Sequence, residues 1–461
     1  MPIQPIGSSG KFYYLVSFDE NGVERPEADG TLLSDTIRKR LADPAEKITD
    51  VFFASHGWKG DVPAAIEQHD KWMGEMVRSP DLAAMLQAHP DFNALNIGLH
   101  WPSLPFGDET LPQSGPAPVL GLDTDVDTEV DRFASVLADT PKARQAIRTI
   151  LEANRRDTGS RTELPDAVRA AYKTVFAEAK LGKSGDDLGA PPGDDHPGLD
   201  AERMYEARRK ADSDAAAEAQ KKAGEVVLGG GGFFDKLKGL LVSPLQQASF
   251  WKMKKRARVV GEGGIHSLLD SLMRTAGDDV RFHLMGHSFG CIVVSAAVAG
   301  PPGTTPLPRG VDTLFLVQGA LSLWSFCADI PFAKGTAGYF RRIMDKGLVR
   351  GPIITTRSKF DNAVGKLYPP AATLANEVIL GTETLPEYGG VGTWGAQGLG
   401  ADATDGVMQP ATATYSFQPK HVYNLEASGI IKDGGGFSGA HSDIAHPEVA
   451  HVFWQAIATS R

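Results

Sequence analysis

Two kinds of hydrophobic pattern alternate along the chain. Short, almost continuously apolar runs rich in β-branched and aromatic residues are typical of strands covered on both faces. They occur at 12–18, 51–55, 96–101, 280–285, 313–318, 352–356 and 421–425. Helix-length segments with apolar residues at three- and four-residue steps lie between or after these runs, at 63–78, 265–274, 290–298 and 447–458. The pattern predicts an α/β fold in which helices flank a mostly parallel sheet.

The predicted strands are unevenly spaced. About 180 residues separate the third strand from the fourth, whereas neighbouring strands are usually joined by short loops and one helix. We therefore expect an insertion at 111–258, between an N-terminal core part at 1–110 and a C-terminal core part at 259–461. Within the insertion, residues 123–180 and 201–225 are charge-rich and helix-prone. This predicts a large, mainly helical cap.

Two further stretches are rich in glycine and break the periodic patterns. Residues 183–200, KSGDDLGAPPGDDHPGLD, have the composition of a loop or hinge. Residues 389–406, between the sixth and seventh predicted strands, are expected to be irregular as well.

Charge and cysteine content exclude several classes of partner and site. The chain has 47 Lys and Arg against 57 Asp and Glu, a formal charge of −10, so no nucleic acid partner is expected. Its two cysteines, Cys291 and Cys327, can form neither a disulfide framework nor a typical zinc site. No metal or organic cofactor is expected.

The N-terminal segment and the apolar runs bear on location. No basic segment followed by an apolar stretch begins the chain, so a cytoplasmic protein is expected, and export that needs no N-terminal signal stays open. No run approaches the ~18 apolar residues that a membrane-spanning helix needs.

The most informative motif is Gly286-His287-Ser288-Phe289-Gly290. It matches GxSxG, with an apolar strand before it and a helix of small residues after it. Glycines are needed on both sides because a serine on a sharp strand-to-helix turn has a strained backbone with no space for neighbouring side chains. At such a turn the Ser288 hydroxyl also lies at a helix N-terminus, which favours developing negative charge.

In these residues the chain resembles the α/β-hydrolase superfamily. The likeness covers roughly 10–110, 260–370 and 418–461 and leaves out the insertion. It implies a mostly parallel α/β-hydrolase sheet and a catalytic order of serine, acid and histidine along the chain.

The resemblance also implies two backbone donors for an oxyanion. One is the N–H after the nucleophile, that of Phe289. The other is expected in the turn His56-Gly57-Trp58, which looks like the family's HG motif; Trp58 N–H is favoured and Gly57 N–H is the alternative. His56 itself is expected to be a structural residue of this turn, because the family's base comes last in the chain.

The family order also narrows the search for base and acid. His441 lies in a glycine-rich loop before the last predicted helix and is the favoured base; His446 is the main alternative, and His421 and His451 are less well placed. The acid is expected in the loop after the strand at 352–356. There Asp361 is the favoured acid. Its rivals are Asp443, Asp329 and Asp345.

Residues 233–260 stand out in this acidic chain because they carry seven Lys or Arg against one Asp. Their apolar residues recur at three- and four-residue steps: Phe233, Phe234, Leu237, Leu240, Leu241 and Leu245. An apolar stripe beside a basic face is typical of interfacial helices, which predicts a lid and peripheral membrane contact through 233–258. The alternative is a helix that packs on the core, is broken at Pro244 and leaves its lysines solvated.

Taken together, the resemblance implies a serine hydrolase that cleaves carboxylic esters. Ser288 attacks, His441 accepts the proton, Asp361 orients His441, and an acyl-enzyme is then hydrolysed. The expected substrate is a small-molecule or lipid-like ester. An amidase, peptidase or thioesterase of the same fold, and a non-catalytic binding module, are the alternatives.

Overall fold

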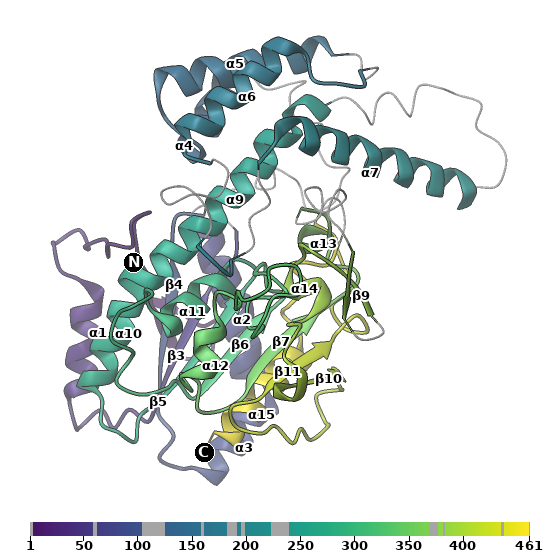
Figure 1. Cartoon of the computed structure of the whole chain (residues 1–461). Helices are drawn as coiled ribbons and strands as arrows, with labels where there is room; N and C mark the ends of the chain where they lie inside the picture. The colour runs from purple at the N-terminus through teal and green to yellow at the C-terminus, as the bar shows by residue number, and fades with distance from the viewer. Residues whose placement is uncertain are drawn as a thin grey trace.

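The structure is a computed structural model of the 461-residue chain. It describes residues 3–58, 62–103, 125–157, 161–181, 191–194, 199–222, 239–367, 377–380, 383–434 and 438–460. A sheet with helices on both faces forms the core, and a group of helices from the middle of the chain stands beyond one end of it (Figure 1).

The main sheet has nine strands in the order β1-β2-β4-β3-β5-β6-β7-β11-β10. β1 is antiparallel to β2, and all other neighbours are parallel. The strands are β1 (Ile3–Pro5), β2 (Phe12–Ser17), β3 (Asp50–Ser55), β4 (Ala94–His100), β5 (Arg281–His287), β6 (Thr313–Val317), β7 (Ile353–Arg357), β10 (Ala403–Val407) and β11 (Val422–Glu426). A separate antiparallel pair contains β8 (Glu377–Leu380) and β9 (Glu383–Pro386).

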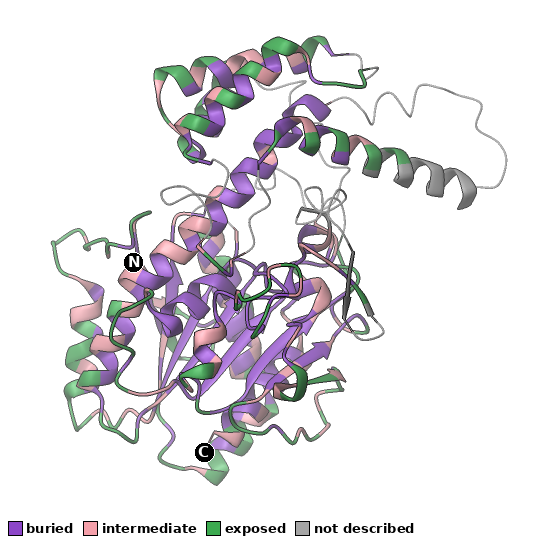
Figure 2. Ribbon diagram, in the orientation of Figure 1, coloured by how far each residue is buried: buried purple, intermediate pink, exposed green. Residues whose placement is uncertain are grey.

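Helices on both faces explain why the central strands are apolar throughout. The flanking helices are α1 (Leu33–Ala42), α2 (Val62–Arg78), α3 (Pro80–Ala88), α10 (His266–Thr275), α11 (Gly290–Ala299) and α15 (Pro447–Thr459). In β3, Val51 and Phe53 join one hydrophobic cluster with α1, α10 and α11, while Phe52 and Ala54 join another with α2, α3 and α15. Alternate residues therefore bury on opposite faces, and the sheet interior is buried throughout (Figure 2).

All seven strands predicted from hydrophobic runs are present, with ends shifted by at most a few residues. The predicted irregularity of 389–406 is wrong, because this stretch contains the short helix α14 (Val391–Trp394) and most of β10. β10 was missed because it is a polar, largely exposed edge strand that is held by parallel pairing with β11 and has no hydrophobic pattern.

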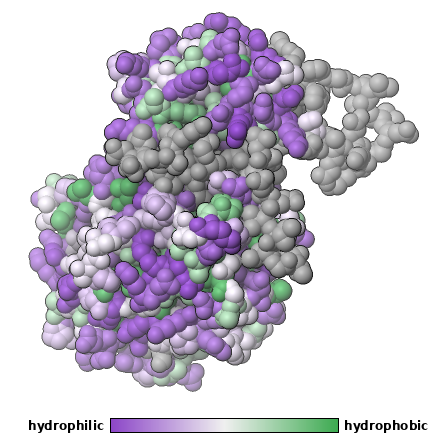
Figure 3. Space-filling view, viewed as in Figure 1, coloured by the Kyte–Doolittle hydropathy of each residue, from purple (hydrophilic) through white to green (hydrophobic). Residues whose placement is uncertain are grey.

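The middle of the chain is helical, as the sequence predicts. Its helices are α4 (Val126–Val136), α5 (Pro141–Arg156), α6 (Asp166–Glu178), α7 (Ala201–Lys222) and α9 (Ser243–Val260), with the short 3₁₀ turn η1 (Leu240–Val242) before α9. α5 contacts both α4 and α6, and α9 runs from this group down to the core, where it contacts α11 (Figure 1). The surface of α4 to α6 in this view is mostly hydrophilic (Figure 3).

α9 packs on the core through α11, as the second interpretation of its sequence predicts, but it differs from that interpretation in two details. Pro244 does not break it but lies in its first turn, where the missing N–H costs no helical hydrogen bond. Leu240, Leu241 and Leu245 are buried, while Phe233, Phe234 and Leu237 lie outside the described residues. The expectation that the lysines are solvated is wrong for Lys254.

Lys254 is buried and forms an ion pair with Asp194, at 2.8 Å between Nζ and Oδ1. Burial lowers the pKa of Lys254, and the carboxylate of Asp194 opposes that shift. Asp194 belongs to the loop predicted at 183–200, so this pair fastens part of that loop to α9.

After α9 the chain continues through a π-helical turn, η2 (Gly261–Ile265), into α10. A Cβ at Gly261 would lie 2.5 Å from the carbonyl oxygen of Val293 in α11. Only glycine therefore allows this close approach of the two backbones. Among the described residues, no helix combines the length and apolar character needed to cross a membrane.

Candidate active site

The turn between β5 and α11 has the geometry that the GxSxG motif predicts. Ser288 has a φ of 57°, in the left-handed region that residues other than glycine rarely adopt. A Cβ at Gly286 would lie 2.5 Å from the Gly290 carbonyl oxygen, and one at Gly290 would lie 2.3 Å from the Ser55 carbonyl oxygen. The serine thus stands on a tight corner that requires both glycines.

The structure brings together three of the predicted residues. His441 Nε2 lies 2.7 Å from Ser288 Oγ, and His441 Nδ1 lies 2.8 Å from Asp361 Oδ2. Because Asp361 Oδ2 accepts the hydrogen from Nδ1, Nε2 is left to accept the Ser288 hydroxyl hydrogen. These distances meet the requirement for a nucleophile, a base and a group that orients the base.

The rival residues have other partners. His446 Nε2 lies 2.8 Å from Asp443 Oδ1, and Asp443 also accepts backbone hydrogen bonds in its own loop. His451 pairs with Asp81 at 2.8 Å, and His421 contacts Thr404. The two aspartates after β6 are engaged locally: Asp329 accepts from Gly335 N, and Asp345 pairs with Arg341.

The loops that carry Asp361 and His441 are joined by backbone contacts. Ala440 N donates to the Phe360 carbonyl at 2.9 Å. Gly439, with a φ of 58°, lies so close that a Cβ there would be 2.3 Å from the same oxygen. These contacts hold Asp361 beside His441 although 80 residues separate them in the chain.

Gln318, which directly follows β6, is hydrogen-bonded to Asp361 and was not identified from the sequence. Its Nε2 donates to Asp361 Oδ2 at 3.0 Å, and its Oε1 accepts from the Thr356 hydroxyl at 3.0 Å. Val364 N donates to the other carboxylate oxygen, Oδ1, at 2.9 Å. Asp361 is 2% exposed, so these donors replace water around its charge. A polar residue directly after a buried parallel strand was the available signal.

The turn after β3 has a defined orientation. The Gly57 carbonyl accepts from His56 Nδ1 at 2.7 Å and from the Ser103 hydroxyl at 3.2 Å. The Gly57–Trp58 peptide is trans, so the Trp58 N–H points away from these two donors. Gly57 N–H is already directed at Gln68 Oε1, 3.4 Å away.

This orientation favours Trp58 over Gly57 as the available donor. A Cβ at Gly57 would lie 2.7 Å from Ser288 Cβ, which shows how closely the turn approaches the serine. Within the described parts of the chain, the backbone N–H groups of Trp58 and Phe289 donate no hydrogen bond. Both are free to bind an anionic oxygen near Ser288.

Cys291, in the first turn of α11 and three residues after Ser288, is not a second nucleophile. Its thiol donates to the Gly286 carbonyl at 3.1 Å. Burial raises the pKa of Cys291 well above its ordinary value, so the thiol stays protonated and unreactive.

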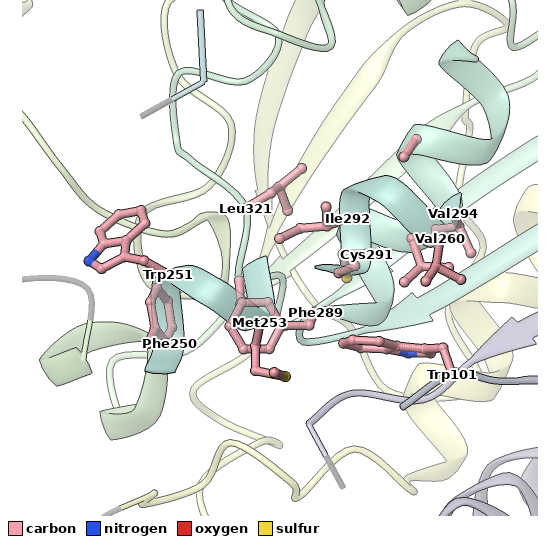
Figure 4. Packing of buried hydrophobic residues seen from close by; sticks show 14 of the residues in the cluster. Trp101, Phe250, Trp251, Met253, Val260, Phe289, Cys291, Ile292, Val294 and Leu321 are labelled. Atoms are coloured by element: carbon pink, nitrogen blue, oxygen red, sulfur yellow. The ribbon is translucent and has the colours of Figure 1, made fainter. Parts of the chain in front are cut away.

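Aromatic side chains pack around Phe289, the residue that follows the serine. Phe250, from α9, has its ring 5.0 Å from that of Phe289, and the Trp58 ring lies 5.5 Å from Phe289. Figure 4 shows Phe250 and Met253 of α9 beside Phe289 at the start of α11. Ser288 is only 3% exposed, and Phe250 of α9 lies against the residue that follows it.

An apolar pocket lies on the other face of the sheet. Its lining includes Phe52 and Met285 from the strands, Met73 from α2, and Phe453 and Trp454 from α15. Ser288, Asp361 and His441 are not among the residues that line this pocket. Across the described residues, no three His, Cys, Asp or Glu side chains gather as metal ligands.

Comparisons with protein-family models, with curated proteins and with solved structures find no match to this chain.

Proposed function

We propose that the chain is a serine hydrolase of the α/β-hydrolase type that cleaves carboxylic esters. The observation that carries this proposal is the continuous series of hydrogen bonds from Asp361 through His441 to Ser288, at 2.8 and 2.7 Å. Its support is that a strained, glycine-flanked serine at a helix N-terminus meets an oriented imidazole, which is the arrangement that activates a hydroxyl nucleophile.

The reaction follows from which atoms can accept and donate. Ser288 Oγ attacks the ester carbonyl carbon while His441 Nε2 takes the hydroxyl proton. The carboxylate of Asp361 stabilises the resulting imidazolium. The protonated His441 then passes its proton to the departing alcohol, which leaves an acyl group on Ser288. Water, activated by the same histidine, releases the acid.

The N–H groups of Trp58 and Phe289 stabilise the tetrahedral oxyanion. They are the backbone donors beside Ser288 that have no partner among the described residues. Loss of one such donor typically costs ~10²–10³ in kcat.

The helical insertion acts as a cap in this proposal, and the substrate carries an apolar group. The support is that Phe250 of α9 packs over Phe289 and that Ser288 is almost fully buried. An apolar acyl or alkyl chain would replace contacts that the aromatic side chains now make with each other.

The test is labelling with a fluorophosphonate probe together with hydrolysis of p-nitrophenyl esters of increasing chain length. Ser288→Ala should abolish labelling and lower turnover by roughly 10⁴-fold or more. Ser295→Ala is the matched control, because Ser295 is a buried serine on α11, the helix that follows Ser288, and its hydroxyl has no partner among the described residues. Turnover that survives in Ser288→Ala would refute the proposal.

A further inference from the structure

A buried glutamine and a buried histidine connect the turn that carries Trp58 to the loop that carries His441. Gln68 Nε2 lies 2.6 Å from His287 Nδ1, and Gln68 Oε1 lies 3.4 Å from Gly57 N. His287 Nε2 lies 2.9 Å from the His441 carbonyl oxygen. Gln68 comes from α2 and His287 from the end of β5, and both are buried.

The contacts from Gly57 N through Gln68 and His287 to the His441 carbonyl form a series of hydrogen bonds. Only one assignment of hydrogens satisfies every member of this series. The His441 carbonyl can only accept, so His287 Nε2 carries a hydrogen and donates it. In a neutral imidazole, Nδ1 then accepts from the Gln68 amide N–H, which leaves Gln68 Oε1 to accept from Gly57 N–H. With the amide turned over, its NH₂ group would face the Gly57 N–H, and two donors would meet in a buried place.

The series contacts both the turn that carries the proposed oxyanion donor and the loop that carries the proposed base. At one end it holds the Gly57 N–H, while His56 and Ser103 hold the Gly57 carbonyl, and so it limits rotation of the turn before Trp58. At the other end it holds the backbone of His441, the base itself. The ring of His287 also lies against that of His441, with 4.8 Å between centroids.

We infer that Gln68 and His287 are positioning residues that fix the oxyanion turn and the catalytic histidine relative to each other. The inference rests on the proposed function, because it assigns a role in that same reaction. A displacement of about 1 Å in such a site costs on the order of 10²-fold in rate. Loss of the series therefore lowers kcat and leaves KM nearly unchanged, because both side chains are buried and act through backbone groups of the turn and the loop.

The first experiment is a double-mutant cycle with Gln68→Leu and His287→Phe, measured as kcat and KM on a p-nitrophenyl ester. Each variant should lose roughly 10- to 100-fold in kcat. The double variant should lose no more than the worse single one, because either change breaks the same series. Losses that multiply, or that fall on KM alone, would overturn the inference.

A second pair of variants separates positioning from folding. His287→Gln keeps a side-chain N–H near the position of Nε2, whereas His287→Asn is too short to reach the His441 carbonyl but is equally polar. The first should retain kcat within about threefold, and the second should lose about tenfold or more. Equal activity in the two variants would overturn the inference.

The control variant is His283→Asn, four positions earlier on the same strand. His283 is also buried, but it bonds Asp50 and Thr313, which belong to neither loop. It should alter thermal stability without altering kcat. If the unaltered protein hydrolyses no ester and takes up no fluorophosphonate, the proposed function fails; if it does both while Gln68→Leu retains full kcat, only the positioning role fails.

Discussion

Replacement of Gly57 by alanine is the most direct perturbation of the proposed oxyanion site. The new Cβ would lie 2.7 Å from Ser288 Cβ and 3.0 Å from His287 Nδ1. Neither neighbour can yield, because Ser288 occupies a strained corner and His287 is hydrogen-bonded at both ring nitrogens. The turn itself must therefore move.

The size of that movement sets the expected loss. Ordinary contact begins at 3.4 Å, so the turn must retreat from Ser288 by about 0.7 Å. An oxyanion donor acts at about 2.7–3.1 Å, so the same retreat takes the Trp58 N–H out of range. We expect kcat to fall by ~10²–10³, about 3–4 kcal/mol, with Ser288 and His441 still hydrogen-bonded.

The assay is stopped-flow measurement of acylation by a p-nitrophenyl ester. Titration with a fluorophosphonate on a longer time scale counts the nucleophiles that remain intact. Gly277→Ala is the matched control, because a Cβ there meets no atom within 4 Å. A Gly57→Ala variant that is acylated at the same rate as the unaltered protein would refute the assignment of this turn as the oxyanion site.

Three further predictions concern the cover, the pH dependence and the buried ion pair. Phe250→Ala should open the apolar cover and speed fluorophosphonate labelling about tenfold, and an unchanged rate would argue against α9 as a barrier. Burial lowers the pKa of His69 to about 4 in the folded protein, so as the pH falls His69 is protonated in the unfolded chain before it is protonated in the folded protein. The free energy of unfolding should then decrease by about 2 kcal/mol between pH 7 and pH 5, and His69→Gln should remove that part of the decrease in urea unfolding. Asp194→Ala should lower the free energy of unfolding by about 3 kcal/mol in the same assay, because it leaves the buried Lys254 ammonium without its carboxylate partner. The double variant with Lys254→Met should recover most of this loss.

The sequence alone predicted the parts of this protein that local pattern controls. The runs that became β3, β5 and β6 are apolar throughout because both faces of a parallel sheet are covered, and that pattern needs no knowledge of neighbours. The corner at Ser288 was equally visible, because its glycines are required by backbone contacts within a few residues and with one adjoining strand. β10 escaped prediction because its pairing with β11, and not its side chains, makes it a strand.

Residues that act through long-range contacts could not be identified in this way. Nothing local distinguishes Gln68 from any other glutamine, and the position of Gln318 after β6 does not reveal its partner; each acquires its role from a partner 219 or 43 positions away. Lys254 looked solvated because its ion-pair partner lies in a distant loop. Chain order favoured His441 and Asp361 as base and acid, but only the fold brings His441 Nε2 to 2.7 Å from Ser288 Oγ and gives the Trp58 N–H its direction. Hydrophobic pattern and backbone sterics are properties of neighbouring residues, whereas hydrogen-bond partnership depends on distances that exist only after the sheet and its loops have assembled.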